Sequence, residues 1–152
     1  MSACPNCQIH SFMPFGFQDD TTFVYTAPVL STEFGETNQT FLNHKAHFDS
    51  IQGSWIWIID FAKTDMKHYI SIGLTKKLSE YLNSAHSSKL KGIYLINPNF
   101  WLRNTIKLAK TVLPNLERKL KLIESTGTGL LLELGSMGVQ HKWLMILKEL
   151  LV

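Results

Sequence analysis

The residues best suited to metal chemistry are two cysteines and a histidine near the N-terminus. Cys4 and Cys7 have the C-x2-C spacing of half a zinc site, and His10 follows three residues later. A structural zinc site takes four ligands, so His44 or His47 would have to supply the last one. The alternative is a pair of reduced thiols in an intracellular protein, because two cysteines are too few for a disulfide framework. We expect no metal, with Cys4, Cys7 and His10 as the candidate ligands if one binds.

Other reactive residue types do not form the arrangements that catalysis needs. Asp60 follows an apolar run and is either a site residue at a strand end or a cap of the following loop. No serine has the G-x-S-x-G setting of a hydrolase, and the G-T-G segment at residues 127–129 lacks the rest of a phosphate-binding loop. The sequence therefore favours a binding protein over an enzyme, without a cofactor.

Basic residues suggest contact with anionic surfaces rather than with nucleic acid. The formal net charge is only +3, and a nucleic-acid footprint needs a denser basic patch. Within residues 99–113, Arg103, Lys107 and Lys110 recur at helical spacing and share one face, separate from the apolar face of the same helix. Such a helix either lies on an anionic membrane or packs on the protein with a solvated basic side.

Two tryptophans mark the candidate apolar site. Trp55 and Trp57 lie two residues apart, so on a strand they point to the same face. They are either part of the ordinary core or the aromatic wall of a cavity for an acyl chain. Burying such a chain contributes about 0.8 kcal/mol per methylene, which gives useful affinity without any sequence motif.

The elements that must position these residues are alternating strands and helices. Residues 55–59 form a continuous apolar run, which predicts a strand buried on both faces. A helix over 66–85 and a second apolar strand over 93–96 complete a βαβ unit with parallel strands and a right-handed crossover. The further predicted elements are a strand at 23–27, helices at 41–52 and 99–113, a strand at 120–123, and helices at 127–134 and 140–151.

The whole pattern predicts one α/β domain. The chain has 152 residues, which suits a single three-layer α/β/α domain with a mostly parallel sheet over residues 23–152. Residues 1–22 show no period and are expected to be an irregular segment packed on that domain. No apolar run is long enough to span a membrane and no secretory signal is found, so we expect a cytoplasmic protein peripheral to membranes.

Residues 92–125, GIYLINPNFWLRNTIKLAKTVLPNLERKLKLIES, resemble the core of the CRAL-TRIO family. That family has an apolar strand ending in Asn, a turn containing Pro, an aromatic-rich helix, and a Lys before the next strand. The run 55–60, which ends in Asp60, resembles another strand of the family. The resemblance covers residues 55–124. It is nearest to the short branch found in neurofibromin and in some Rho GTPase-activating proteins, without the helical segment that precedes the core in longer members.

The resemblance implies a lipid site with a movable cover. In lipid-transfer members, the helix matching residues 99–113 is a gate over an apolar cavity. The gate residues here would be Phe100, Trp101, Ile106 and Val112. The floor would come from the strands at 55–59 and 93–96, with Trp55, Trp57, Ile59 and Tyr94 as lipid-binding residues.

The resemblance also implies where a lipid headgroup would be recognised. Phosphatidylinositol-binding members carry a Glu-Arg pair before the strand and a Lys after the gate helix. Ser88 and Lys89 stand at the pair here, and Lys119 matches the later Lys. A lysine does not hold a phosphate bidentately as arginine does, so a phosphoinositide preference is not implied. The expected headgroup or membrane contacts are Lys89, Arg103, Lys107, Lys110 and Lys119.

Three functions follow as expectations. The first is binding and transfer of a phospholipid or other hydrophobic molecule, with transient membrane contact. The alternative is an adaptor of the same fold with a filled cavity, which binds a protein partner or a second copy of itself, since uncovered apolar surface tends to be buried by association. The third is a small domain stabilised by a metal at the N-terminal cysteines.

Overall fold

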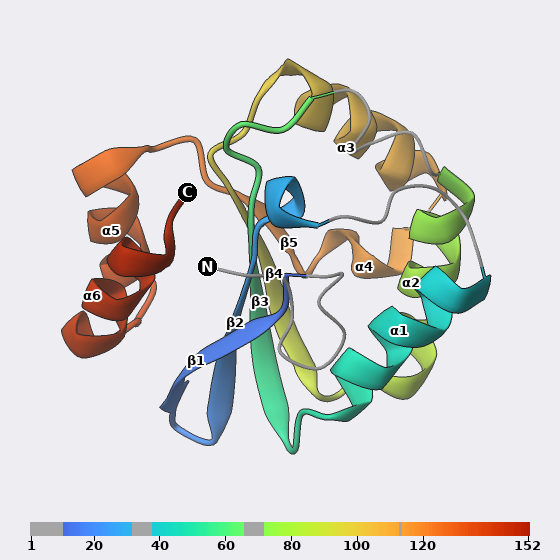
Figure 1. The fold of residues 1–152 in the computed structure, drawn as a ribbon, viewed down its shortest axis with the longest axis horizontal. Helices are drawn as coiled ribbons and strands as arrows, with labels where there is room; N and C mark the ends of the chain where they lie inside the picture. Colours follow the sequence, from blue (N-terminus) through green and yellow to red (C-terminus); the bar gives the residue numbers. More distant parts are fainter. Residues whose placement is uncertain (1–10, 32–37, 66–71, 113) are drawn as a thin grey trace.

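A five-stranded sheet lies between two layers of helices (Figure 1). The computed structural model describes residues 11–31, 38–65, 72–112 and 114–152. The strands are β1 (Met13–Gln18), β2 (Thr21–Thr26), β3 (Ser54–Asp60), β4 (Leu90–Ile96) and β5 (Leu120–Leu122). The helices are the 3-10 turn η1 (Pro28–Leu30), α1 (Asn38–Asp49), α2 (Ile72–Ala85), α3 (Phe100–Val112), α4 (Pro114–Glu117), α5 (Gly127–Ser136) and α6 (His141–Leu150).

The sheet has the order β1-β2-β3-β4-β5, and β2 to β5 are parallel. Helices α1 to α4, which connect these parallel strands, cover one face, and α5 and α6 cover the other (Figure 1). The predicted βαβ unit is confirmed, since β3 pairs in parallel with β4 across α2. The prediction of a mostly parallel α/β/α sandwich is confirmed with it.

The N-terminal strand β1 corrects the expectation of an irregular segment over residues 1–22. It pairs antiparallel with β2 and forms a hairpin. The turn residues Asp19 and Asp20 have φ values of 51° and 60°, the left-handed conformation that a type I′ hairpin turn needs at both positions. A boundary at residue 22 therefore falls inside this hairpin. The first ten residues lie outside the described ranges.

The other predicted elements are present, with shifted ends. The helix expected at 41–52 ends at Asp49, and Gly53, with φ 79°, lies in the turn into β3. Of the helix expected at 66–85, residues 66–71 lie outside the described ranges, and the remainder is α2. Pro114 opens the short helix α4, as its fixed φ and missing N–H favour.

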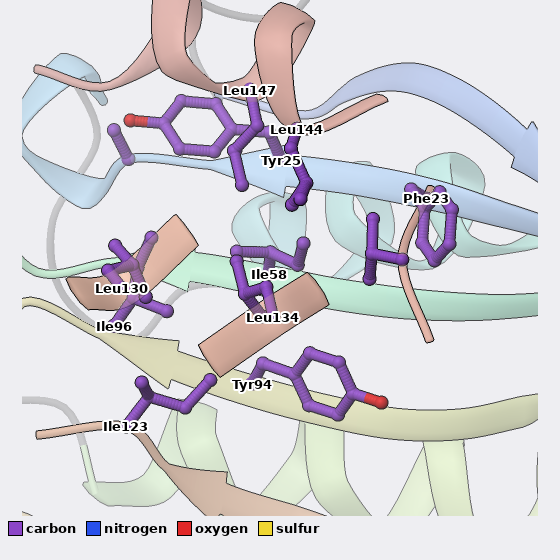
Figure 2. Packing of buried hydrophobic residues seen from close by; sticks show 12 residues of the cluster. Phe23, Tyr25, Ile58, Tyr94, Ile96, Ile123, Leu130, Leu134, Leu144 and Leu147 are labelled. Atoms are coloured by element: carbon purple, nitrogen blue, oxygen red, sulfur yellow. The ribbon is translucent and has the colours of Figure 1, made fainter. Parts of the chain in front are cut away.

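Apolar side chains form one cluster on each face of the sheet. The first cluster lies under α1, α2 and α3; its buried members are Phe12, Val24, Phe48, Ile51, Trp55, Trp57, Leu82, Leu90, Ile93, Leu95 and Leu102. The second cluster lies under α5 and α6, and Figure 2 shows its strand and helix side chains interleaved. Its buried members are Phe23, Tyr25, Ala27, Ile58, Tyr94, Ile96, Ile123, Leu130, Leu134, Val139, Leu144 and Leu147.

Candidate ligand-binding face

Helix α3 is fixed at its N-terminal end by Asn99. The Asn99 Oδ1 accepts a hydrogen bond from the backbone N–H of Leu102 at 2.9 Å, which is the geometry of a helix cap. The Asn99 Nδ2 donates to Thr64 Oγ1 at 2.9 Å. One side chain therefore both starts the helix and ties it to the loop after β3.

The body of α3 is attached to the sheet by few of its described side chains. Leu102 is buried in the first cluster and Ile106 is half-buried against it. Phe100 and Trp101, which we expected to close over a cavity, lie outside this contact, with 66% and 39% of their surface exposed. Their rings meet edge to face with centroids 5.4 Å apart. The side chain of Val112 falls outside the described part of the chain.

The tryptophan pair lies in an aromatic group at the other end of the first cluster. Trp55 and Trp57 have ring centroids 5.8 Å apart, and Phe48 of α1 lies 5.6 Å from the first and 5.2 Å from the second. Phe12 adds a fourth ring, 6.0 Å from Trp55 and 6.2 Å from Trp57. The Trp57 Nε1 donates to Thr26 Oγ1 at 2.8 Å. These rings pack on one another beneath α1.

The structure separates Tyr94 from the other expected lipid-binding residues. Tyr94 belongs to the second cluster, under α5 and α6, whereas Trp55 and Trp57 belong to the first. Its ring lies over Gly92, where an added Cβ would come within 2.9 Å of the ring. Burial raises the pKa of the Tyr94 hydroxyl. Ile59 packs on the first cluster, so the expected floor is divided between two faces of the sheet.

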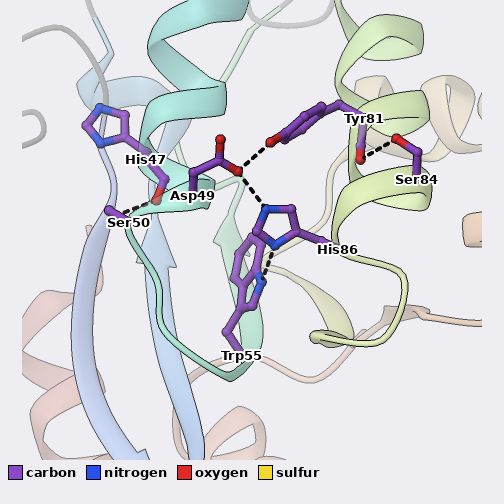
Figure 3. A network of polar contacts seen from close by, with 7 residues as sticks. All are labelled: His47, Asp49, Ser50, Trp55, Tyr81, Ser84 and His86. Carbon is purple, nitrogen blue, oxygen red and sulfur yellow. Dashed lines mark hydrogen bonds and ion pairs between the residues drawn. The ribbon is translucent and has the colours of Figure 1, made fainter.

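A polar network closes the aromatic group (Figure 3). The Trp55 Nε1 donates to Nδ1 of His86 at 3.2 Å, and His86 Nε2 lies 3.0 Å from Asp49 Oδ1. An indole nitrogen is only a donor, so Nδ1 must be the unprotonated acceptor and Nε2 must carry the proton that goes to Asp49. The network therefore fixes the tautomer of a histidine that is 2% exposed.

Asp49 and Tyr81 complete this network at its solvent side. The Tyr81 hydroxyl donates to Asp49 Oδ1. Burial, followed by the hydrogen bond to this carboxylate and its charge, raises the pKa of Tyr81 to about 12. For Asp49, burial acts to raise the pKa, but hydrogen bonds from Tyr81 and His86 outweigh it and leave the pKa below its usual value. The carboxylate thus stays ionised as the acceptor of both groups.

His86 was not predicted from the sequence as a site residue. It is buried, against Trp55. A signal was present, because Leu78, Leu82 and His86 recur at i+4 and continue the apolar stripe of α2 by one turn.

At the carboxyl end of β3, the carboxylate of Asp60 accepts hydrogen bonds from several segments of the chain. Its Oδ2 accepts the Tyr25 hydroxyl at 2.6 Å, and its Oδ1 accepts Asn97 Nδ2 at 2.8 Å and the Ala62 N–H at 3.0 Å. The Val152 N–H lies 3.4 Å from Oδ2. Burial and this hydrogen bond from Tyr25 raise the pKa of the tyrosine. The side chain caps the following loop, one of the two roles the sequence allowed.

The comparison with protein families identifies the family to which this fold belongs. The CRAL/TRIO domain model matches residues 34–134, well over half of the 152-residue chain. The chain belongs to the CRAL/TRIO family. No curated protein matches it. Membership indicates binding of a lipophilic ligand in general, since this is a ligand-binding and transfer family.

The cations expected to meet a headgroup lie at two different ends of this CRAL/TRIO domain. Lys89 is exposed just before β4. The Lys119 ammonium lies at the same end, where it donates to the carbonyl of Ser87 at 2.6 Å. Arg103 instead pairs with Glu124, beyond the other end of β5, with 2.6 Å between Nη2 and Oε2. The strand between residues 119 and 124 spans roughly 16 Å. A single lipid headgroup therefore does not reach both Lys119 and Arg103.

The remaining candidates can be placed only in part. Lys107 is exposed on α3, whereas the side chain of Lys110 falls outside the described residues. Cys4, Cys7 and His10 also lie outside them. Within the described ranges, no three His, Cys, Asp or Glu side chains come together as metal ligands. A helix with the length and apolar character needed to cross a bilayer does not occur in those ranges either.

Proposed function

We propose that this CRAL/TRIO domain holds a lipid or similar hydrophobic molecule between α3 and strands β4 and β5, with α3 as the movable cover. The observation that carries the proposal is the light attachment of residues 100–107 of α3, the part of the helix whose side chains are described. In its described part, one buried and one half-buried side chain face the sheet, and two large aromatics at its start face solvent.

The energy that holds this part of α3 closed is comparable with what a lipid can supply. Burial of Leu102 contributes about 1.5–3 kcal/mol, and half-burial of Ile106 about 1 kcal/mol. The Arg103–Glu124 pair is exposed on both sides and adds little, because solvent screens an exposed ion pair. An acyl chain gains about 0.8 kcal/mol per methylene, so about eight buried methylenes supply roughly 6 kcal/mol. A bound chain is therefore able to offset the displacement of these contacts.

The exposed start of α3 is suited to a membrane interface. Aromatic side chains favour the headgroup level of a bilayer, and Phe100 and Trp101 stand together there. Arg103 and Lys107 on the same helix add attraction to anionic lipid. Because the Arg103 guanidinium is paired with Glu124, membrane contact through it competes with that ion pair.

Lipid uptake from vesicles tests the proposal. The purified full chain is incubated with phosphatidylcholine vesicles containing phosphatidylserine, separated from them, extracted and analysed by mass spectrometry. We expect about one lipid per chain, and at least a tenfold slower uptake for the variant carrying Phe100→Ser and Trp101→Ser. Leu132→Ser on α5 is the matched control, because Leu132 is 70% exposed on the opposite layer. A chain that carries no lipid and takes none up contradicts the proposal.

The adaptor function is the second candidate, because aromatic rings fill the space beneath α1. Phe12, Phe48, Trp55 and Trp57 contact one another and leave their end of the first cluster packed. An adaptor would take up no lipid, and its vesicle binding would be unchanged by Arg103→Glu. The lipid-binding proposal expects a clear loss of vesicle binding in that variant, so one measurement separates the two.

A further inference from the structure

Strand β5 lies at the end of the sheet and pairs on one side with β4. The Ile93 N–H donates to the Lys119 carbonyl at 2.8 Å, and the Ile123 N–H donates to the Leu95 carbonyl at 2.9 Å. Backbone groups of a strand alternate in direction, so Lys119, Lys121 and Ile123 turn theirs toward β4. The N–H and C=O groups of Leu120 and Leu122 therefore point away from the sheet.

Among the described residues, no strand pairs with the outer side of β5, and side chains of this strand reach solvent. Leu122 is 36% exposed and Lys121 is exposed, whereas Leu120 is half-buried against the first cluster. An edge with unpaired backbone groups is a template on which another extended chain adds a strand. The opposite edge strand, β1, is instead tied to the helices at its end, because the side chain of Gln18 forms hydrogen bonds with the turn between α5 and α6.

Positive charge surrounds this edge. Arg118, Lys119 and Lys121 lie at or next to β5, and Lys91 lies on the neighbouring strand. Burial lowers the pKa of Lys119, and the charges of Arg118 and Lys91 lower it further, so these cations repel one another. The carboxylate closest to the strand's other end, Glu124, is already paired with Arg103. The charge at the start of β5 thus favours an anionic partner.

We infer that the edge of β5 accepts an extended acidic segment of a partner protein, which adds to the sheet as a sixth strand. The open groups of Leu120 and Leu122 supply the backbone hydrogen bonds, and the surrounding cations select acidic side chains. A second copy of β5 is disfavoured, because it would place lysines opposite lysines. This binding is separate from lipid uptake under α3 and does not depend on it.

The test uses the full chain and a fluorescein-labelled ten-residue peptide of alternating Glu and Val, followed by fluorescence anisotropy. We expect saturable binding that weakens with salt, and no binding of the Lys-Val counterpart. The double variant Arg118→Glu and Lys121→Glu should weaken binding at least tenfold. Lys148→Glu on α6 is the control for a change of charge elsewhere and should leave binding unchanged.

A proline at residue 122 tests the backbone part of the inference. Leu122→Pro removes an N–H that points away from β4, and prolines are tolerated on that side of an edge strand. Loss of one hydrogen bond should weaken peptide binding by about threefold to tenfold, with an unchanged circular dichroism spectrum. The matched control on the peptide side is a Glu-Val peptide of the same length with two internal prolines, which should not bind because it cannot pair as a strand.

Three results would overturn the inference. One is the absence of an anisotropy change, or equal binding of the acidic and basic peptides. Another is unchanged binding in the Arg118→Glu and Lys121→Glu double variant. The third is binding of phosphatidylserine vesicles through these two cations without competition from the acidic peptide, which would assign the surface to a membrane.

Discussion

The hydrogen bond between Trp55 and His86 offers the sharpest test of the candidate face. Replacing His86 with Phe keeps a ring of similar size but leaves the Trp55 N–H buried without its acceptor at 3.2 Å. A buried donor left unsatisfied costs about 1–3 kcal/mol. We expect His86→Phe to lower the free energy of unfolding by about that amount, in addition to any change in packing.

A double-mutant cycle isolates the bond itself. Trp55→Phe removes the donor together with part of the ring, and by itself it costs both the bond and the volume. When His86 is already Phe, the same change also removes the unsatisfied N–H and should cost less. We expect the two substitutions to be coupled by about 1–2 kcal/mol, since contacting residues in one hydrogen-bond network commonly show such values.

Denaturation of the four proteins in urea measures this coupling. The matched control is Trp57→Phe combined with His86→Phe, because the Trp57 N–H bonds to Thr26 rather than to His86. That pair should be additive within about 0.5 kcal/mol. Additivity of the Trp55 pair would refute the reasoning. So would a nitrogen NMR spectrum that places the neutral His86 proton on Nδ1 rather than on Nε2.

Three other contacts give separate predictions. Burial, and then the charge of His44, lower the pKa of His47, so the unfolded chain binds a proton at a higher pH than the folded chain. As the pH drops below about 6.5, the free energy of unfolding should decrease by at most about 1.4 kcal/mol per pH unit. In denaturation curves His47→Phe should flatten this slope, whereas the exposed control His141→Phe should not. Gln18→Ala removes two hydrogen bonds to the α5–α6 turn, at 2.7 and 2.9 Å, and should cost about 1–2 kcal/mol in urea denaturation; no loss would contradict their role. Gly16→Ala should lower the free energy of unfolding by about 1–3 kcal/mol, measured by thermal denaturation, because the added Cβ would lie 2.9 Å from the Trp143 ring. An equal loss of stability in a Trp143→Leu background would contradict this cause.

The parallel core of the fold could be predicted because its strands carry a strong signal. Burial on both faces makes β3 and β4 continuous apolar runs, and the helix between them fixes their parallel pairing. The sequence signal for the hairpin strand β1 is weaker. Its turn is Asp-Asp rather than the Asn-Gly or Asp-Gly that usually marks such hairpins, and Pro14 and Gly16 interrupt the alternation at a bulge.

The candidate site was harder to predict, because it depends on which face each strand presents. Alternation shows that Ile93 and Tyr94 point to opposite faces, but it does not tell which of them shares a face with Trp57. The register settles this, since Trp57 pairs with Ile93 and both lie in the first cluster. The exposure of Trp101 also depends on tertiary packing, because helical periodicity alone places it beside the apolar stripe.

The two ends of the first cluster differ in how readily they can admit a ligand. Beneath α1, a ligand would have to displace Trp55 or Trp57. Each of these side chains buries roughly 200 Å² of surface, which contributes about 5 kcal/mol, and each also donates a hydrogen bond that would be lost. Beneath α3, it meets the aliphatic side chains of Leu95 and Leu120 under a helix whose described contacts total about the same as one such ring. Entry at the α3 end also leaves the His86 network intact. We therefore expect a bound lipid to lift α3 and leave the tryptophan fluorescence of the buried pair unchanged, with a change confined to Trp101.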